Sequence, residues 1–186
     1  MTLSEKSLTE FKHLLVLDLT KIGTAYQMIN SFVDDEAVHV FEISPIGTNA
    51  VFILGANDLI TLQLVQQQAV SFFKSDILNI RLIDDVHPTV LLAYLSQSSV
   101  ALNKHIAVIE ETSFALAFHA AQTAAKLGVG LVDFRAVRTG VPNLMITLTS
   151  DSIEKLAKAG ELSSLSKFTM INDVQKPLRA YFEVLD

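Results

Sequence analysis

An internal repeat constrains this chain of 186 residues more than any other feature. Residues 13–20, HLLVLDLT, return ninety-two positions later as residues 105–112, HIAVIEET. The apolar stripe of an amphipathic helix follows at the same offset, and later landmarks keep their order while the offset drifts by a few residues. The five stripe positions are Ala25, Met28, Ile29, Phe32 and Val33, which match Ala117, Ala120, Ala121, Ala124 and Ala125. The repeat predicts two copies of one fold of roughly ninety residues each.

Each copy reads as strand, helix, strand, glycine-containing turn, strand, helix, strand. We expect strands at 13–20, 38–44, 50–54 and 77–83, and again at 105–112, 129–135, 144–148 and 168–171. Helices are expected at 24–34 and 114–126, after the N-caps Asp58 and Asp151, and at 88–95 and 177–182. The fold class is therefore α/β (α+β), with two tandem ferredoxin-like βαββαβ domains, each a sheet covered by two helices. The expected bounds are an N-terminal extension at 1–12, a first domain at 13–100 and a second at 101–186, joined by the linker 96–103.

Composition narrows the class of protein. Half of the residues are hydrophobic, 18% are charged, and the mean hydropathy is +0.40. No apolar segment approaches the roughly 20 residues of a membrane-spanning helix, and residues 1–12 lack the apolar core of a signal peptide. We therefore expect a cytoplasmic protein whose excess apolar surface is buried between subunits. A net charge of −6 argues against nucleic acid, and the lack of cysteine excludes disulfides, thiolate metal sites and cysteine nucleophiles.

Residues 109–112, IEET, are followed by an alanine-rich helix and then by 130–132, GLV. This order of motifs resembles the shell domain of bacterial microcompartments (the BMC family). In the first copy, 17–23, LDLTKIG, is close to the family's Ile-Glu-Thr-Lys-Gly signature with one additional residue. The turn 45–49 resembles the family's pore loop, and 153–160 resembles its second helix. A duplicated chain of this length is similar to the tandem-domain shell proteins that form trimers shaped like hexamers.

The resemblance implies a structural shell-type protein in which three subunits close around an axis and six turns meet at a central pore. The pore-lining residues would be Ile46, Gly47, Thr48 and Asn49 of the first copy, and Arg138, Thr139, Gly140 and Val141 of the second. Glycine suits a point where backbones converge, and three Arg138 side chains would favour small polar or anionic metabolites. Without the resemblance, ordinary turns and a solvated arginine explain the same residues better than a pore does.

The resemblance also implies an edge contact for Lys21 between neighbouring rings, although a solvated lysine fits the sequence as well. The second copy has Ser113 where the edge lysine would lie, and neither copy keeps the arginine of the family's Pro-Arg-Pro stretch. We therefore still expect three subunits to form a ring. The expectation that such rings tile into sheets is weaker. The partners that the resemblance implies are two further copies of the chain, in a homotrimer, together with other shell proteins and enclosed enzymes.

The remaining polar residues do not form a recognisable catalytic pattern. His13 and His105 are expected to occupy the same position in the two copies, and the five histidines show no spacing typical of a metal site. The acidic clusters at 34–36 and 84–85 fall at element ends, where solvated carboxylates are ordinary. We therefore expect no cofactor, no metal and no enzyme activity. The alternative is an oligomeric ferredoxin-like regulatory or small-ligand-binding protein, with a ligand in the clefts between copies.

Overall fold

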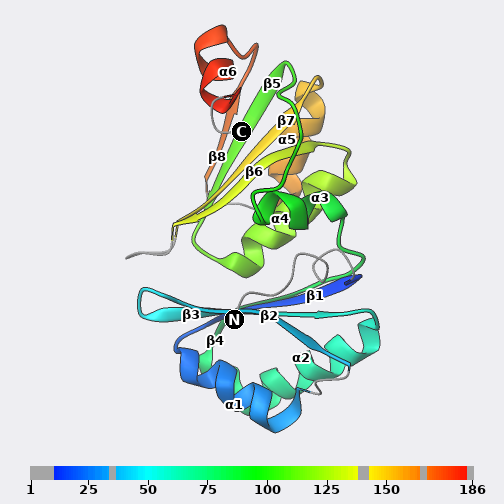
Figure 1. Ribbon diagram of the computed structural model, residues 1–186, viewed down its shortest axis with the longest axis vertical. Coiled ribbons are helices and arrows are strands. Elements are labelled where there is room, and N and C mark those ends of the chain that lie inside the picture. The colour runs from blue at the N-terminus through cyan, green and yellow to red at the C-terminus, as the bar shows by residue number, and fades with distance from the viewer. Residues whose placement is uncertain (1–10, 34–36, 138–142, 164–166, 184–186) are drawn as a thin grey trace.

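The computed structural model describes residues 11–33, 37–137, 143–163 and 167–183, which form two four-stranded antiparallel sheets (Figure 1). Sheet A has the strand order β2-β3-β1-β4, and sheet B has the equivalent order β6-β7-β5-β8. The strands of sheet A are β1 (His13–Leu19), β2 (His39–Ile46), β3 (Asn49–Ala56) and β4 (Ile77–Ile83). Those of sheet B are β5 (His105–Glu111), β6 (Gly130–Val137), β7 (Asn143–Ser150) and β8 (Lys167–Ile171). The expected fold class, two tandem ferredoxin-like domains, is confirmed.

Each copy contributes two long helices and one short helix. They are α1 (Ile22–Phe32), α2 (Leu59–Phe73) and α3 (Pro88–Tyr94) in the first copy, and α4 (Phe114–Lys126), α5 (Ile153–Ser163) and α6 (Lys176–Glu183) in the second. Helix α3 of the first copy packs on β6 and α4 of the second. A short 3-10 turn, Lys74–Asp76, links α2 to β4. Helix α1 begins two residues earlier than expected, directly after the extended residue Lys21. None of the helices in the described part of the chain is long and apolar enough to cross a membrane.

The repeat extends to individual hydrogen bonds. The Nδ1 atom of His13 accepts a hydrogen bond from the backbone amide of Asp85 at 3.2 Å, and Nδ1 of His105 accepts one from Asp173 at the same distance. Both aspartates have a left-handed backbone, with φ values of 48° and 53°. The prediction that the two histidines share one structural position is therefore confirmed.

One of the two expected N-caps is correct. The Asp58 carboxylate accepts hydrogen bonds from amides two and three residues later and caps α2. The expectation for Asp151 was wrong, because α5 begins at Ile153 and the preceding residue, Ser152, provides the capping oxygen. The Asp151 carboxylate instead accepts a hydrogen bond from the amide of Lys104, just before β5.

Strand β1 is buried on both faces, and this feature joins the two copies. Leu15, Leu17 and their neighbours on the inner face of sheet A form one core with α1 and α2. Leu14 and Val16, on the outer face, belong to a larger core that includes α4 and sheet B. All four side chains are fully buried. Helix α4 therefore lies between the two sheets, as Figure 1 shows, and contacts β1 and β4 of the first copy as well as its own sheet.

Candidate pore loops and the junction between the copies

The β2–β3 turn is a two-residue turn closed by the pairing of Ile46 with Asn49. Gly47 has a φ of 59°, a conformation that favours glycine. The Thr48 side chain is exposed, and its hydroxyl contacts the Asn49 side chain at 3.4 Å. Ile46 is 2% exposed and packs in the larger core. In the single chain, Gly47 and Thr48 are therefore exposed at the tip of the turn, whereas the buried Ile46 side chain fixes the turn to the core.

The corresponding turn of the second copy contains Arg138, Thr139, Gly140 and Val141, which lie outside the described residues. Its flanking residues, Val137 and Asn143, pair across β6 and β7 as Ile46 and Asn49 pair across β2 and β3. In Figure 1 the end of β6 and the start of β7 lie on the same side of the molecule as the β2–β3 turn. That arrangement is what a common axis would require, and the pore-lining role of both turns stays a prediction.

Beside the first turn, a buried carboxylate joins the two copies. Asp18 of β1 is 8% exposed and accepts three hydrogen bonds from the start of α4. The donors are the Ser113 hydroxyl at 2.5 Å and the amides of Phe114 and Ala115 at 2.9 and 3.2 Å. The positive end of the helix dipole lies at the same point. Burial nevertheless dominates and raises the pKa of Asp18, although the three hydrogen bonds oppose the shift.

A pocket of about 430 Å³ opens at this junction. It is lined by Asp18, Ile46, Asn49, Ala50, Leu78, Asn79, Thr112, Ser113 and Phe114. The first candidate pore turn and the start of α4 therefore border the same hollow. Sequence reasoning did not select Asp18 or Ser113 as functional residues. The signal that could have selected them is an acid inside an apolar strand, paired with a serine directly before a helix.

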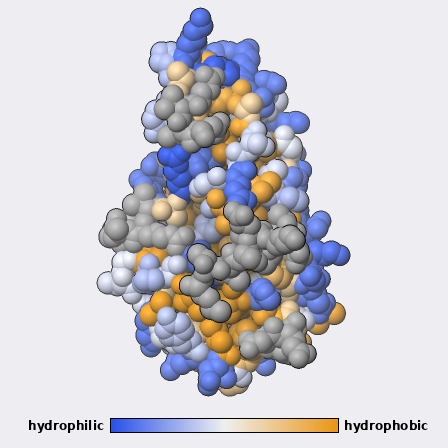
Figure 2. All heavy atoms as spheres, in the orientation of Figure 1, coloured by the Kyte–Doolittle hydropathy of each residue, from blue (hydrophilic) through white to orange (hydrophobic). Residues whose placement is uncertain are grey.

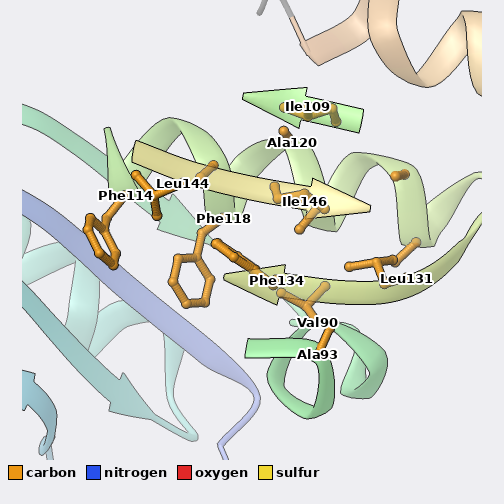
Figure 3. Close-up of a cluster of buried hydrophobic side chains, with 14 of the residues drawn as sticks. Val90, Ala93, Ile109, Phe114, Phe118, Ala120, Leu131, Phe134, Leu144 and Ile146 are labelled. Carbon is orange, nitrogen blue, oxygen red and sulfur yellow. The ribbon is translucent and has the colours of Figure 1, made fainter. Parts of the chain in front are cut away.

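Helix α4 is anchored on the first copy by one aromatic and one amide side chain. The Phe118 ring lies 4.8 Å from that of Tyr94 on α3 and 5.1 Å from that of Phe134 on β6. Figure 3 shows Phe114 and Phe118 pointing from α4 toward the first copy. The Gln122 side chain binds the backbone of the turn that follows β4. Its Nε2 atom donates a hydrogen bond to the Asp85 carbonyl at 2.7 Å, and its Oε1 atom accepts one from the backbone amide of His87 at 2.8 Å.

Lys21 lies at the N-cap position of α1, with a side chain that is 62% exposed. Its Nζ atom is 3.2 Å from a carboxylate oxygen of Asp76, which also accepts a hydrogen bond from the Thr24 hydroxyl at 2.9 Å. The Thr24 hydrogen bond, with help from Lys21, lowers the pKa of Asp76. The lysine is thus held at the start of α1, and its contact with another ring stays a prediction. Across residues 11–33, 37–137, 143–163 and 167–183, no three histidine, aspartate or glutamate side chains come together as a metal site requires.

No known family model matches this chain, and no curated protein matches its sequence. Among solved structures, a microcompartments protein from Desulfitobacterium hafniense DCB superposes with a TM-score of 0.73. The match covers 90% of this chain and 98% of that protein at 22% sequence identity, and it shows a shared fold. A putative glycine cleavage system transcriptional repressor and a putative chlorite dismutase match with TM-scores of only 0.31 and 0.34, too low to support an argument.

Proposed function

We propose that this chain is a non-catalytic shell-type subunit of a bacterial microcompartment in the cytoplasm. Three subunits would close into a pseudohexameric homotrimer, alone or beside other shell proteins and enclosed enzymes. The two domains of each subunit would span 13–100 and 101–186. The opening at the centre of the trimer would pass small polar or anionic metabolites.

The observation that carries the proposal is the structural likeness of 90% of this chain, across both copies, to a microcompartments protein. The packing of the two copies adds physical support. Helix α4 of the second copy covers the sheet of the first, so each chain already contains one contact between neighbouring copies. A ring of six such copies would repeat contacts of this kind around one axis.

The pore part of the proposal rests on the two turns. Gly47 and Thr48 are exposed at the β2–β3 turn, on the side of the molecule where β6 and β7 also end. Three copies of each turn would surround the axis, with hydroxyl groups and backbone amides as the polar lining. Arg138 would add three positive charges and so favour anions over cations.

Native mass tests the assembly first. One chain weighs 20.4 kDa, so light scattering behind a size-exclusion column should give three times that mass. Negative-stain electron microscopy should then show discs with six lobes and a central depression. A stable monomer would contradict the proposal.

The pocket at the junction favours a second candidate, an oligomeric regulatory protein that binds a small ligand between its copies. Its volume of about 430 Å³ is in the range of small-molecule sites, and Asp18 and Asn49 are polar groups in its lining. A thermal-shift screen with amino acids and nucleotides separates the candidates, because a ligand that binds the native state raises the melting temperature by mass action. A reproducible, concentration-dependent rise for one compound would favour this candidate over a shell subunit.

A further inference from the structure

Strand β4 forms one border of sheet A, and its outer side has no strand beside it in the described part of the chain. The strand order β2-β3-β1-β4 gives β4 a single neighbour, β1, with which it pairs in antiparallel direction. In an antiparallel pair, every second residue directs its amide and carbonyl away from the partner strand. The outer side of β4 therefore presents a row of backbone hydrogen-bonding groups that a further strand can use.

A groove of about 340 Å³ lies beside this border, between β4 and the C-terminal end of α2. This β4 groove is lined by Val70, Lys74 and residues 77–81. Val70 is 40% exposed and Leu78 is 48% exposed, so apolar side chains of the groove are open to water. Figure 2 shows further apolar residues gathered over the lower part of the molecule, where the first copy lies. The groove thus places apolar surface next to the open backbone of β4.

The register of β4 fixes where an added strand can pair. Asp18 pairs with Asn79 and Leu19 with Ile77, so Leu78 is an extra residue that forms a bulge. The pairing with β1 is regular from Asn79 to Ile83. A regular run of this length is close to that of an average strand, and it gives an extended segment a straight border to pair with.

The charge of the groove is positive. Lys74 and Arg81 are the charged residues among the described ones that line it, and both are exposed. Neither forms an ion pair with another described residue, and the nearby carboxylate of Asp76 is bound by Lys21. The Arg81 guanidinium donates instead to the carbonyl of Ile80, in its own strand, at 3.0 Å. Two unpaired cations beside an open strand favour an acidic partner.

The corresponding border of sheet B differs. Arg81 of β4 pairs with Val16, whereas the residue of β8 that pairs with the equivalent Val108 is Thr169. Strand β8 also has five residues, against seven in β4. The cationic border is therefore a property of the first copy, and the fold that the two copies share does not require it.

We propose that the β4 groove binds an extended, acidic segment of another protein, which joins sheet A as a fifth strand beside β4. The backbone of that segment pairs with residues 79–83. Its apolar side chains, at alternate positions, pack against Val70 and Ile80 on the α2 side, and its acidic side chains lie on the opposite face beside Arg81. Backbone pairing supplies affinity in strand addition, and the side chains supply specificity. The inference goes beyond the proposed function, because the groove is complete in a single chain.

A synthetic peptide tests the groove directly. The probe is a fluorescein-labelled peptide with blocked ends, Glu-Val-Thr-Val-Thr-Val-Glu, in which the valines share one face of a strand and the glutamates share the other. A glutamate at each end serves either strand direction. Fluorescence anisotropy should show saturable binding to the wild-type protein, and added salt should weaken it because the charges involved are exposed.

Two control peptides separate backbone pairing from charge. One has lysine in place of both glutamates, and the other is N-methylated at alternate amides, which removes the donors for a strand ladder. Each should bind at least about tenfold more weakly than the probe. Equal binding of either control would overturn the proposal, as would a wild-type protein that does not bind the probe.

A matched pair of charge reversals tests the protein side. Lys74→Glu with Arg81→Glu should weaken binding of the probe by at least about tenfold, because both positions then repel it. Lys155→Glu with Lys158→Glu, at two exposed lysines of α5, changes the net charge equally and should leave binding unchanged. Undiminished binding by the first variant would overturn the proposal.

Hydrogen exchange and native mass complete the test. The probe should slow amide exchange within residues 77–83 and leave residues 167–171 unchanged, and protection elsewhere alone would contradict the assignment. The variant Lys74→Glu with Arg81→Glu should keep the native mass of the wild type. A lower mass would show that a second copy of this chain fills the groove, which would overturn the choice of partner. A wild-type trimer that does not bind the probe would overturn this inference alone, whereas a monomer that binds it would overturn the proposed function alone.

Discussion

Asp18 is a carboxyl group inside an apolar strand, 8% exposed, with three hydrogen-bond donors from the other copy. The folded protein stabilises its charge through these donors, yet desolvation by burial is the larger effect and raises the pKa. A raised pKa means that the folded state binds a proton more tightly than the unfolded state. The contribution of this group to stability is therefore fully present below the ordinary aspartate pKa and is lost as the pH rises through the raised value.

The first prediction concerns Asp18→Asn, which removes the titration. The difference in unfolding free energy, wild type minus variant, should fall as the pH rises from the ordinary aspartate pKa through the raised one, and should be flat above it. Urea unfolding at a series of pH values measures this difference. Carboxyls whose pKa is lowered, such as Asp76 and Asp58, contribute with the opposite sign, but the wild type and the variant both contain them. A difference that increased with pH would show that the hydrogen bonds outweigh burial.

The second prediction compares two glycines. Gly47→Ala should lower the unfolding free energy by about 1–2 kcal/mol, because φ is 59° there and an L side chain disfavours that conformation. Gly23→Ala, in the first turn of α1, should raise it by about 0.4–1 kcal/mol, since no heavy atom beyond the chain neighbours and the helix's own backbone lies within 4 Å of the added methyl group. Urea unfolding of both variants checks the signs. Equal effects would mean that backbone conformation does not set the role of Gly47.

Helix α4 is the element that joins the two copies, because it packs against strands of both sheet A and sheet B. A helix that is apolar nearly all round is typical of a fully enclosed one. The third prediction is that Phe118→Ala lowers the unfolding free energy by about 3–5 kcal/mol, since the ring is fully buried between copies and leaves a cavity. Phe72→Ala, at a ring that is 73% exposed, should change it by no more than about 0.5 kcal/mol. Denaturant titration at one protein concentration gives both values. Similar losses of unfolding free energy in the two variants would refute the claim that α4 joins the two copies.

Local periodicity predicted most of these elements, because strands and helices of this length leave clear patterns. The apolar run of β1 predicted a strand, but it did not reveal that two different copies bury its two faces. The alanines of α4 predicted a buried stripe, while Phe118 and Gln122, which dock on the first copy, lie off that stripe. Ser113 was interpreted as the loss of an edge lysine, although it caps α4 and donates to Asp18. No local sequence pattern predicts an interaction between a helix N-terminus and an acid 95 positions earlier in the chain.

The whole molecule is held by a core that belongs to neither copy alone. Leu14 and Val16 of the first copy and Phe118 and Phe134 of the second belong to the same buried cluster. Opening one copy would expose the outer face of sheet A or one side of α4 to water, which is costly for apolar surface. The two copies should therefore unfold together, even though each has its own sheet and a repeat can behave as separate units.

The last prediction follows from this shared core. Scanning calorimetry of the wild-type protein should give one transition instead of two. Leu62→Ala offers a sharper form of the test, because Leu62 is fully buried in the core that only the first copy forms with its own helices. This substitution should cost about 2–5 kcal/mol and move the single transition to a lower temperature as a whole. Two independent copies would respond differently, since the first would melt early and the second would keep its melting temperature. A split transition in Leu62→Ala would therefore show that α4 holds the copies together less strongly than each copy holds itself.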